Sequence, residues 1–307
     1  MTKPSTGGYP TFPSSFAALD GPLNTFDRAA AVVLPVPYDA TTSYRTGTRD
    51  GPHALIEASR YLELYEAELD HEPSEWGIAT LPEIEPDVSG PEAMIDRVER
   101  AVRDVIDAGR LPVVLGGEHS ITVGAVRAAK RAFPGLSVLQ LDAHADMRDS
   151  YQGSHFSHAT VMRRVRESVS TAVQVGVRSI SAEERAHLRQ AGAEVAIYRE
   201  GDLLDPNRRK AVAARLSDDV YVTIDLDALD PGFMPAVGTP EPGGLSWIET
   251  VSLLREVAET SRIVGFDVVE LAPSEGPVAS AFSAARLTYT MIGYALALGP
   301  GARPKPG

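Results

Sequence analysis

The chain has 307 residues, of which 43% are hydrophobic, so a packed core is expected and wholesale disorder is excluded. Its 29 basic and 42 acidic residues give a formal net charge of −13, which disfavours nucleic acid and anionic membranes as partners and suits a small cationic substrate. The absence of cysteine excludes disulfides and thiolate metal sites, so any metal must be held by nitrogen and oxygen ligands.

Short apolar runs rich in β-branched residues alternate with helix-like segments along most of the chain. In chain order, strands are expected at residues 31–36, 112–115, 136–141, 172–177, 193–198, 220–224 and 263–269. Helices are expected at 51–69, 91–108, 120–132, 157–169, 182–191, 207–216 and 246–259. Near-continuous apolar strands that alternate with helices predict a doubly wound α/β fold around a mainly parallel sheet.

Nothing in the sequence divides the chain into domains. Residues 81–90 read as a surface loop, and residues 1–307 are interpreted as a single domain with flexible ends at about 1–15 and 299–307. The first residues lack the apolar core of a secretory signal, and no window approaches about 18 uninterrupted apolar residues. A cytoplasmic protein without a membrane span is therefore expected.

Carboxylates and histidines follow three of the predicted strands immediately. The sequences after these strands are Gly-Gly-Glu-His-Ser at 116–120, Asp-Ala-His-Ala-Asp at 142–146 and Asp-Leu-Asp-Ala-Leu-Asp-Pro at 225–231. In an open parallel sheet, ligands bind beyond the carboxyl ends of the strands. The three clusters are therefore expected to converge on one site.

The spacing within two of the clusters favours a shared pocket. Alternate side chains of extended backbone point the same way, so Asp142, His144 and Asp146 should face one pocket together. The same reasoning applies to Asp225 and Asp227.

Each cluster alone also has an ordinary structural interpretation. Gly116 and Gly117 would let the chain turn sharply before His119, and a histidine after such a turn is usually structural. Asp225 and Asp227 could form a turn or a helix cap. Three ionisable groups beside an apolar strand are costly unless they are paired or coordinated, so the three clusters together favour a metal site.

The set of candidate ligands constrains the metal. Carboxylates and imidazoles without sulfur suit hard or borderline divalent cations such as Mn²⁺, and Co²⁺ and Ni²⁺ also accept them. Six side chains are too many for one closed tetrahedral site, whereas bridging carboxylates can hold two ions about 3.5–4 Å apart. The sequence thus predicts a two-metal site that activates water, formed by His119, Asp142, His144, Asp146, Asp225 and Asp227.

In identity, order and spacing, the three clusters resemble the ureohydrolase family of arginases and agmatinases. The resemblance extends over nearly the whole chain, through Gly-Thr-Arg-Asp-Gly-Pro at 47–52, Gly-Thr-Pro-Glu-Pro-Gly-Gly at 238–244 and Val-Val-Glu-Leu-Ala-Pro at 268–273. It implies a three-layer αβα fold, two Mn²⁺ ions per chain, hydrolysis of a guanidino group to urea and an amine, and assembly into trimers or hexamers.

Carried over by position, the resemblance also implies which side chains share each ion. One ion would be held by His119, Asp142, Asp146 and Asp225, and the other by Asp142, His144, Asp225 and Asp227. Asp142 and Asp225 would bridge the two.

Three residues are expected to be catalytic on the same grounds. Glu270 would receive the substrate guanidinium, and Asp146 would pass a proton to the departing amine. His158 would bind substrate and exchange protons with bulk water, with His155 as the weaker alternative. Asp230 is interpreted as a turn residue.

The substrate tail is less constrained. Met-Arg-Asp-Ser-Tyr-Gln at 147–152 departs from the Asn- and Ser/Thr-rich loop of arginases, and Arg178-Ser-Ile-Ser stands where arginases continue with an acidic pair. The runs at 156–158, 161–164 and 176–179 look more like agmatinases. Hydrolysis of agmatine to putrescine and urea, a step of polyamine biosynthesis, is therefore favoured.

Other functions remain open at this point. A ureohydrolase acting on guanidinobutyrate or guanidinopropionate would want a basic group at the pocket mouth, and Arg148 could supply it. An arginase is the remaining alternative within the family. A single-zinc deacetylase-like protein, or a relative that binds metal without catalysis, represents a different class that metal stoichiometry would separate.

Overall fold

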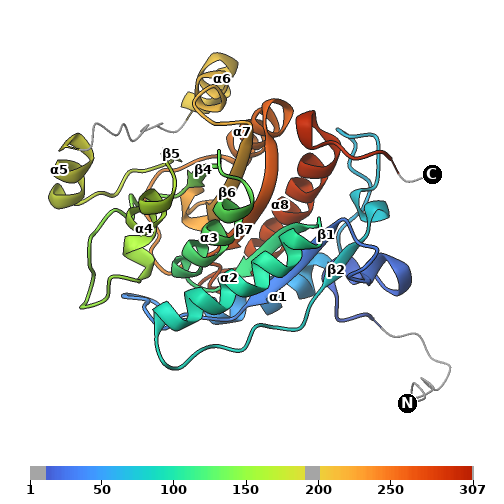
Figure 1. Ribbon diagram of the computed structural model, residues 1–307, viewed down its shortest axis with the longest axis horizontal. Helices are drawn as coiled ribbons and strands as arrows, with labels where there is room; N and C mark the ends of the chain where they lie inside the picture. The colour runs from blue at the N-terminus through green and yellow to red at the C-terminus, as the bar shows by residue number, and fades with distance from the viewer. Residues whose placement is uncertain (1–11, 191–200, 306–307) are drawn as a thin grey trace.

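The computed structural model describes residues 12–190 and 201–305. Seven parallel strands form one sheet in the order β2-β1-β3-β7-β6-β4-β5 (Figure 1). The strands are β1 Ala31–Val36, β2 Ile78–Thr80, β3 Leu111–Gly116, β4 Ser137–Leu141, β5 Thr171–Val175, β6 Asp219–Asp225 and β7 Arg262–Val269. The predicted α/β fold around a mainly parallel sheet is confirmed.

Helices cover both faces of the sheet. They are α1 Gly51–Ser59, α2 Pro91–Asp107, α3 Thr122–Ala132, α4 Val161–Ser168, α5 Ala182–Gln190, α6 Pro206–Ala213, α7 Trp247–Thr260 and α8 Val278–Ala297. Helices α2, α3 and α4 pack together on one face, whereas α1, α7 and α8 pack on the other and α6 lies against α7 (Figure 1). The result is the three-layer αβα architecture.

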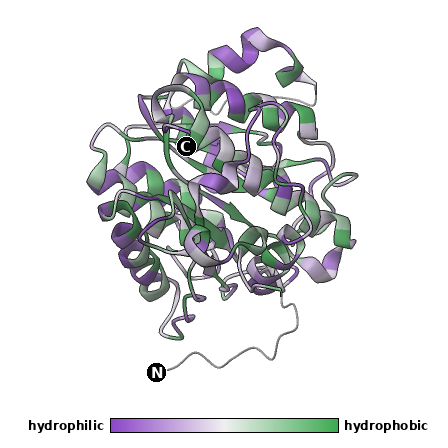
Figure 2. Cartoon of the chain, turned by 90° about the vertical axis from the view of Figure 1, so that its right-hand side faces the viewer, coloured by the Kyte–Doolittle hydropathy of each residue, from purple (hydrophilic) through white to green (hydrophobic). Residues whose placement is uncertain are grey.

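The strands are apolar because both of their faces are buried. Successive residues of β1, Val32 and Val33, are fully buried in two different hydrophobic cores, one on each side of the sheet. Figure 2 shows hydrophobic residues along the central strands and hydrophilic residues on the outer surfaces of the helices. Within the described residues, no helix combines the length and the apolar character that crossing a lipid bilayer requires.

Contacts with α8 end one predicted helix early. The helix expected at 51–69 stops at Ser59, and the chain that follows is held by side chains of α8. Tyr289 donates from its hydroxyl to the carbonyl of Leu64 over 2.6 Å, and Arg286 lies 3.0 Å from the carboxylate of Glu66. These tertiary hydrogen bonds replace the helical ones.

Two elements were not predicted. Strand β2 is only three residues long, and α8 is buried on most of its circumference, so neither shows a clear periodic pattern. The strand expected at 193–198 lies outside the described residues.

The described part of the C-terminal tail packs against the rest of the chain. Gly299–Gly301 forms a short 3-10 helix, and the indole of Trp76 donates to the carbonyl of Pro304 over 2.8 Å. At the other end, Ser15 is buried. That residues 1–307 form a single domain stays a prediction.

Strand order and register place the three predicted clusters side by side. Strands β3, β7, β6 and β4 are consecutive neighbours in the middle of the sheet. Their register aligns one residue near the carboxyl end of each strand in a single row: Leu115, Val268, Ile224 and Leu141. The residues that follow these strands therefore begin at one level along the same edge of the sheet.

Candidate active site

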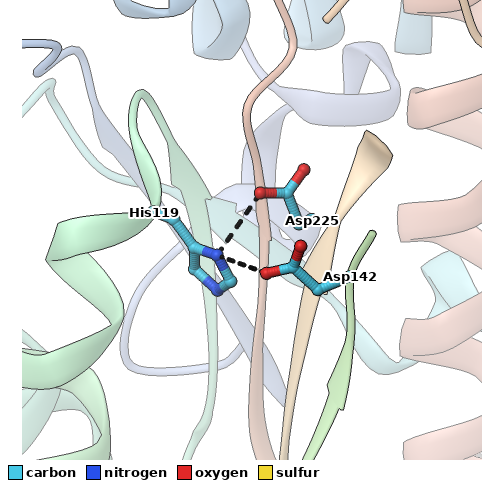
Figure 3. A group of neighbouring side chains, drawn as sticks. All are labelled: His119, Asp142 and Asp225. Atoms are coloured by element: carbon cyan, nitrogen blue, oxygen red, sulfur yellow. Dashed lines mark ion pairs between the residues drawn. The ribbon is translucent and has the colours of Figure 1, made fainter. Parts of the chain in front are cut away.

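Three of the predicted ligands meet at the carboxyl ends of neighbouring strands. The Nδ1 atom of His119 lies 3.1 Å from Asp142 Oδ2 and 3.3 Å from Asp225 Oδ2. Figure 3 shows the three side chains pointing toward one another from three separate segments of the chain. One ligand atom from each lies within 4.8 Å of the others, so His119, Asp142 and Asp225 form a compact group, called here the first group.

The hydrogen bonds of His119 leave one ring nitrogen without a partner. Thr223 donates its hydroxyl proton to Asp267 over 2.6 Å, so the same oxygen accepts from His119 Nε2 over 2.8 Å. The other nitrogen, Nδ1, is buried and has no hydrogen-bond partner among the described residues. This atom faces carboxylate oxygens, an arrangement that a cation between them would satisfy.

Asp142, His144 and Asp227 form a second compact group. His144 Nδ1 lies 2.9 Å from Asp227 Oδ2 and 3.6 Å from Asp142 Oδ1. Asp142 thus turns Oδ1 toward the second group and Oδ2 toward His119 in the first. The donor set of both groups is nitrogen and carboxylate oxygen, which fits divalent cations of the manganese type.

The backbone that aims Asp146 and Asp227 is not the extended backbone that the spacing predicted. Asp146 has a left-handed conformation with φ of 50°, which costs a non-glycine residue about 1–3 kcal/mol. Asp227 lies in a 3-10 turn, Leu226–Ala228, whose start is capped by the Asp225 carboxylate accepting from Asp227 N over 2.9 Å. The pockets are shared as expected, but local turns rather than strand alternation produce them.

Asp146 approaches the first group without belonging to either compact group. Its Oδ2 atom lies 3.2 Å from His119 Nδ1. The next residue is clamped, because Met147 N donates to the buried carboxylate of Glu184 over 2.9 Å. This clamp on Met147 helps to hold Asp146 in its strained conformation.

The Gly-Gly pair before His119 serves close packing and not a left-handed turn. A Cβ atom on Gly117 would lie 1.9 Å from the carbonyl oxygen of Tyr38, and one on Gly116 would lie 2.6 Å from the Val269 side chain. Any larger residue would push β3 away from its neighbours. The chain bends at residues 117–118, as the sharp turn predicted, and close packing explains why both positions of the pair are glycine.

Glu270 lies beside the first group. It follows β7 with a left-handed φ of 66°, and its backbone N donates to Gly117 O over 2.9 Å. Its Oε1 accepts from the backbone N of His119 over 2.7 Å. The side chain is buried but lines the pocket, so the carboxylate retains acceptor capacity toward a ligand.

The two candidate proton shuttles differ in position. His158 lines the pocket, with Nδ1 3.4 Å from Thr41 Oγ1 and Nε2 3.3 Å from Ser43 Oγ. His155 is 59% exposed and contacts the carbonyl of Asp149, away from the pocket lining.

Asp230 accepts from Gly232 N over 2.7 Å. This contact agrees with its interpretation as a turn residue.

Burial controls the titration of the pocket acids. Burial, with the charge of Asp142 adding to it, raises the pKa of Asp146 to about 7. Burial and the charge of Glu118 raise the pKa of Glu270 to about 8. Burial also lowers the pKa of His158 to about 4, so that imidazole is neutral at neutral pH.

In the second group the imidazole takes up positive charge. Burial lowers the pKa of His144, but its hydrogen bonds with Asp142 and Asp227 outweigh burial and raise the pKa to about 12. Burial and the charge of Asp142 raise the pKa of Asp227. In the absence of a cation, protons thus offset the carboxylate charges, and a divalent cation would displace them.

The two groups lie on the floor of a cavity of about 180 Å³. Its wall is formed mostly by loop residues, among them Ser43, Arg148, Tyr151, Ser181 and Thr239, and by Glu184 of α5. The Arg148 guanidinium lies over the ring of Tyr151, 5.1 Å from its centroid.

Sequence reasoning missed the polar residues that support the floor from below. Asp267 is buried and accepts from the hydroxyls of Thr223, Thr122 and Tyr221, and Gln140 donates to Asp142 Oδ2 over 2.5 Å. Polar residues inside otherwise apolar strands, as at Gln140, Thr223 and Asp267, were the available signal, because an unpaired polar group there is costly.

Comparison with known proteins identifies the chain's relatives. The Arginase family matches residues 29–293 of this chain. The N(1)-aminopropylagmatine ureohydrolase of Synechocystis sp. is 42% identical over 281 residues, which cover 89% of this chain and 91% of that protein. The agmatinase of Pyrococcus horikoshii is 35% identical over 286 residues, covering 91% and 97%.

A solved structure shows the same fold. The agmatine ureohydrolase of Thermoplasma volcanium superimposes with a TM-score of 0.81 at 34% sequence identity. The match covers 89% of this chain and 92% of that one.

Proposed function

This chain belongs to the arginase family, and from that premise we propose that it hydrolyses the guanidino group of an agmatine-type amine to urea and a free amine. The observation that carries the proposal is the floor of the cavity. Two adjoining ligand groups share Asp142, and the Glu270 carboxylate lies beside them in the same cavity. The arrangement offers places for a cation pair and for a guanidinium.

We propose two Mn²⁺ ions as the resident metals, held by His119, Asp142, His144, Asp146, Asp225 and Asp227. The unpartnered Nδ1 of His119 and the sulfur-free donor set support this assignment. Bound there, a pair of divalent cations lowers the pKa of a water molecule toward about 7 and so supplies a nucleophile at neutral pH. Bridging by Asp225 in addition to Asp142 is part of the proposal.

Glu270 orients the substrate. Oε1 is already fixed by the backbone N of His119, so the remaining lone pairs accept charge-assisted hydrogen bonds from the guanidinium. Burial and the charge of Glu118 raise the pKa of Glu270 to about 8. A guanidinium bound beside Glu270 would stabilise its ionised carboxylate. This contact places the guanidinium carbon over the floor.

Asp146 and His158 handle protons. The Asp146 carboxylate lies 3.2 Å from His119 Nδ1 at the edge of the cavity, where it can take up a proton and return it to the leaving amine. The neutral ring of His158 accepts a proton and exchanges it with solvent along the Ser43 side of the pocket, 3.3 Å away.

The charges on the wall support a cationic substrate tail. Glu184 places a buried carboxylate among the residues that line the cavity, where it would suit a cationic tail. Arg148 is the opposing feature, because its guanidinium would suit the carboxylate of guanidinobutyrate or guanidinopropionate. We place agmatine ahead of these guanidino acids.

A second substrate within the same class is N(1)-aminopropylagmatine. The Synechocystis relative named for that activity is 42% identical, against 35% for the Pyrococcus agmatinase. Both substrates share the guanidinium and a cationic tail, and they differ in tail length. The cavity floor serves both, so the distinction rests on the wall.

A substrate panel tests the proposal. Urea release with added Mn²⁺ is measured for agmatine, N(1)-aminopropylagmatine, arginine, guanidinobutyrate and guanidinopropionate. We expect the highest kcat/KM for one of the two cationic amines. If neither amine yields urea, the proposed substrate class is wrong. If a guanidino acid is preferred, Arg148 and not Glu184 is the residue that binds the substrate tail.

Metal stoichiometry tests the class of enzyme separately. We expect two ions per chain, whereas one tightly bound zinc would favour a deacetylase-like protein. Assembly into trimers or hexamers, and a cytoplasmic location, are carried forward as predictions that mass photometry and cell fractionation can check.

A further inference from the structure

Arg178 lies three residues after the end of β5, and the sequence singled it out as a departure from arginases within a run that looks like agmatinases. Its side chain is not among those that line the cavity. Among the described residues, every hydrogen bond from its guanidinium goes to a main-chain carbonyl. We therefore expect the guanidinium to hold loop backbone in place rather than to bind substrate.

The strongest of these bonds join two loops at the site. The Nη2 atom of Arg178 donates to Asp227 O and to Glu241 O, each over 2.8 Å. Its Nε atom donates to Pro242 O over 3.1 Å. Longer bonds of 3.3 to 3.4 Å reach the carbonyls of Gly176, Ala228 and Leu229. The planar guanidinium thus holds the turn that carries Asp227 against residues 241–242.

The backbone of Arg178 reaches the other ligands of the second group. Its N–H donates to Ala143 O over 2.8 Å, and the next N–H, of Ser179, donates to the same oxygen over 2.9 Å. Ala143 lies between Asp142 and His144, and its own N–H donates to Asp227 Oδ1 over 2.9 Å. Arg178 is therefore bonded to the main chain beside all three ligands of the second group.

The ligands specific to the first group are held by other contacts. Thr223 orients the ring of His119, and Glu270 accepts from its backbone N. Asp225 is the last residue of β6, within the strand ladder. Only Asp142 is common to both groups, so loss of Arg178 should loosen one group more than the other.

From these contacts we propose that Arg178 is a positioning residue for the second metal ion, the one placed among Asp142, His144 and Asp227 with Asp225 as the proposed bridge. The proposal rests on the two-metal centre of the proposed function. The proposal gives Arg178 no direct contact with the guanidino substrate. Its effect on turnover is transmitted through the position of the second ion.

Charge and geometry predict opposite effects for one variant. A cation near a dication repels it, so on charge alone Arg178→Met would tighten binding of the second ion. On the positioning account the same variant weakens binding, because two loops lose their common donor. Arg178→Lys keeps the charge, but a single ammonium cannot span carbonyls on two loops.

The test measures metal occupancy at each position. Wild-type protein, Arg178→Lys and Arg178→Met are stripped of metal and titrated with Mn²⁺, and anomalous scattering from crystals at limiting Mn²⁺ gives the occupancy of each ion. We expect the affinity for the second ion to fall about 10–100-fold in both variants. Affinity for the first ion should stay within about threefold of wild type.

Arg166→Lys is the matched control. Arg166 donates to the carbonyl of Ala172 over 2.8 Å at the opposite end of β5, far along the strand from the cavity. This variant changes an arginine-to-carbonyl bond at β5 that involves neither ligand group. It should leave both metal affinities unchanged while lowering Tm, which separates positioning from general stability.

Three results would overturn the inference: equal weakening at both ions, tighter binding of the second ion in Arg178→Met, or unchanged binding in both variants. A different result would contradict the proposed function: wild-type protein that binds two ions but releases no urea from any guanidino amine. In that case a selective effect of Arg178 on the second ion would still support the positioning role.

Discussion

The floor and the wall of the cavity are built on different principles. The floor consists of side chains at the ends of four adjacent strands, chiefly His119, Asp142, Asp225 and Glu270, and the row of aligned residues beneath them fixes their level. The wall consists mainly of loop side chains such as Ser43, Arg148 and Thr239. A rigid sheet therefore positions the groups proposed for chemistry, and loops position those proposed for the substrate tail.

The two regions also differ in how their polar groups are satisfied. On the floor, carboxylates and imidazoles lie in contact with one another, and His119 Nδ1 has no hydrogen-bond partner within the part of the chain that the structure describes. On the wall, Glu184 accepts backbone N–H groups from Met147 and Ser181 and caps the start of α5. Changes to the floor should thus affect all guanidino substrates alike, whereas changes to the wall should distinguish among them.

The largest effect is expected from Asp142→Asn. This change removes the only carboxylate that belongs to both ligand groups. We expect kcat to fall on the order of 10³-fold for every guanidino substrate, a loss at the upper end of those seen when one charge-stabilising group is removed. Elemental analysis of the purified variant should show fewer than two ions per chain. Full metal content with near-normal turnover would contradict the assignment.

Thr223→Val tests the support below the floor. Valine keeps the volume of threonine but cannot accept from His119 Nε2, so the imidazole loses the contact that orients its ring. We expect metal affinity to fall about 10–100-fold, measured by Mn²⁺ titration. Thr171→Val, at the amino end of β5, is the control and should bind Mn²⁺ as wild type does.

Glu184→Gln should separate the wall from the floor. Loss of the carboxylate removes a charged partner for a cationic tail, so kcat/KM for agmatine is expected to fall roughly tenfold, about 1.4 kcal/mol. Butylguanidine, which lacks the terminal amine, should lose less, because only the contact of Glu184 with Met147 N, beside Asp146, is weakened for it. Glu183→Gln, an exposed neighbour on α5, serves as the control. Equal losses on both substrates would assign Glu184 a purely structural role.

The smallest effect concerns the pH dependence of the metal-free protein. Burial raises the pKa of Asp146 to about 7 and of Glu270 to about 8, both above their unfolded values. Such carboxyls bind protons more tightly in the folded state, so stability increases as pH falls from about 8 toward about 5. His144 acts in the same direction, because hydrogen bonds with Asp142 and Asp227 outweigh burial and raise its pKa to about 12.

We expect the Tm of the EDTA-treated protein to rise over that range. Saturating Mn²⁺ should abolish or reverse the trend, because the ions replace those protons. A metal-free Tm that rises toward pH 8 would show that the floor is not the source of the dependence.

Much of the site was predictable from local sequence. Apolar runs identified β1, β3, β4, β5, β6 and β7, and the polar clusters after three of them named candidate ligands that the structure brings together. This worked because parallel strands buried on both faces concentrate their polar residues at the strand ends. The same reasoning could not find Asp267, which lies inside β7 and is satisfied by hydroxyls from other segments.

The amino-acid sequence by itself determined the chemistry of the floor: which strands end in carboxylates and imidazoles, and that no sulfur ligand is present. Only the tertiary structure decided how those groups are aimed. Asp146 points into the site through a left-handed backbone and Asp227 through a 3-10 turn. Arg178, which the sequence used only to judge the substrate, hydrogen-bonds two loops in the structure. Side-chain identity is a local property, whereas strand order and the hydrogen bonds that hold a strained turn arise from segments far apart in the chain.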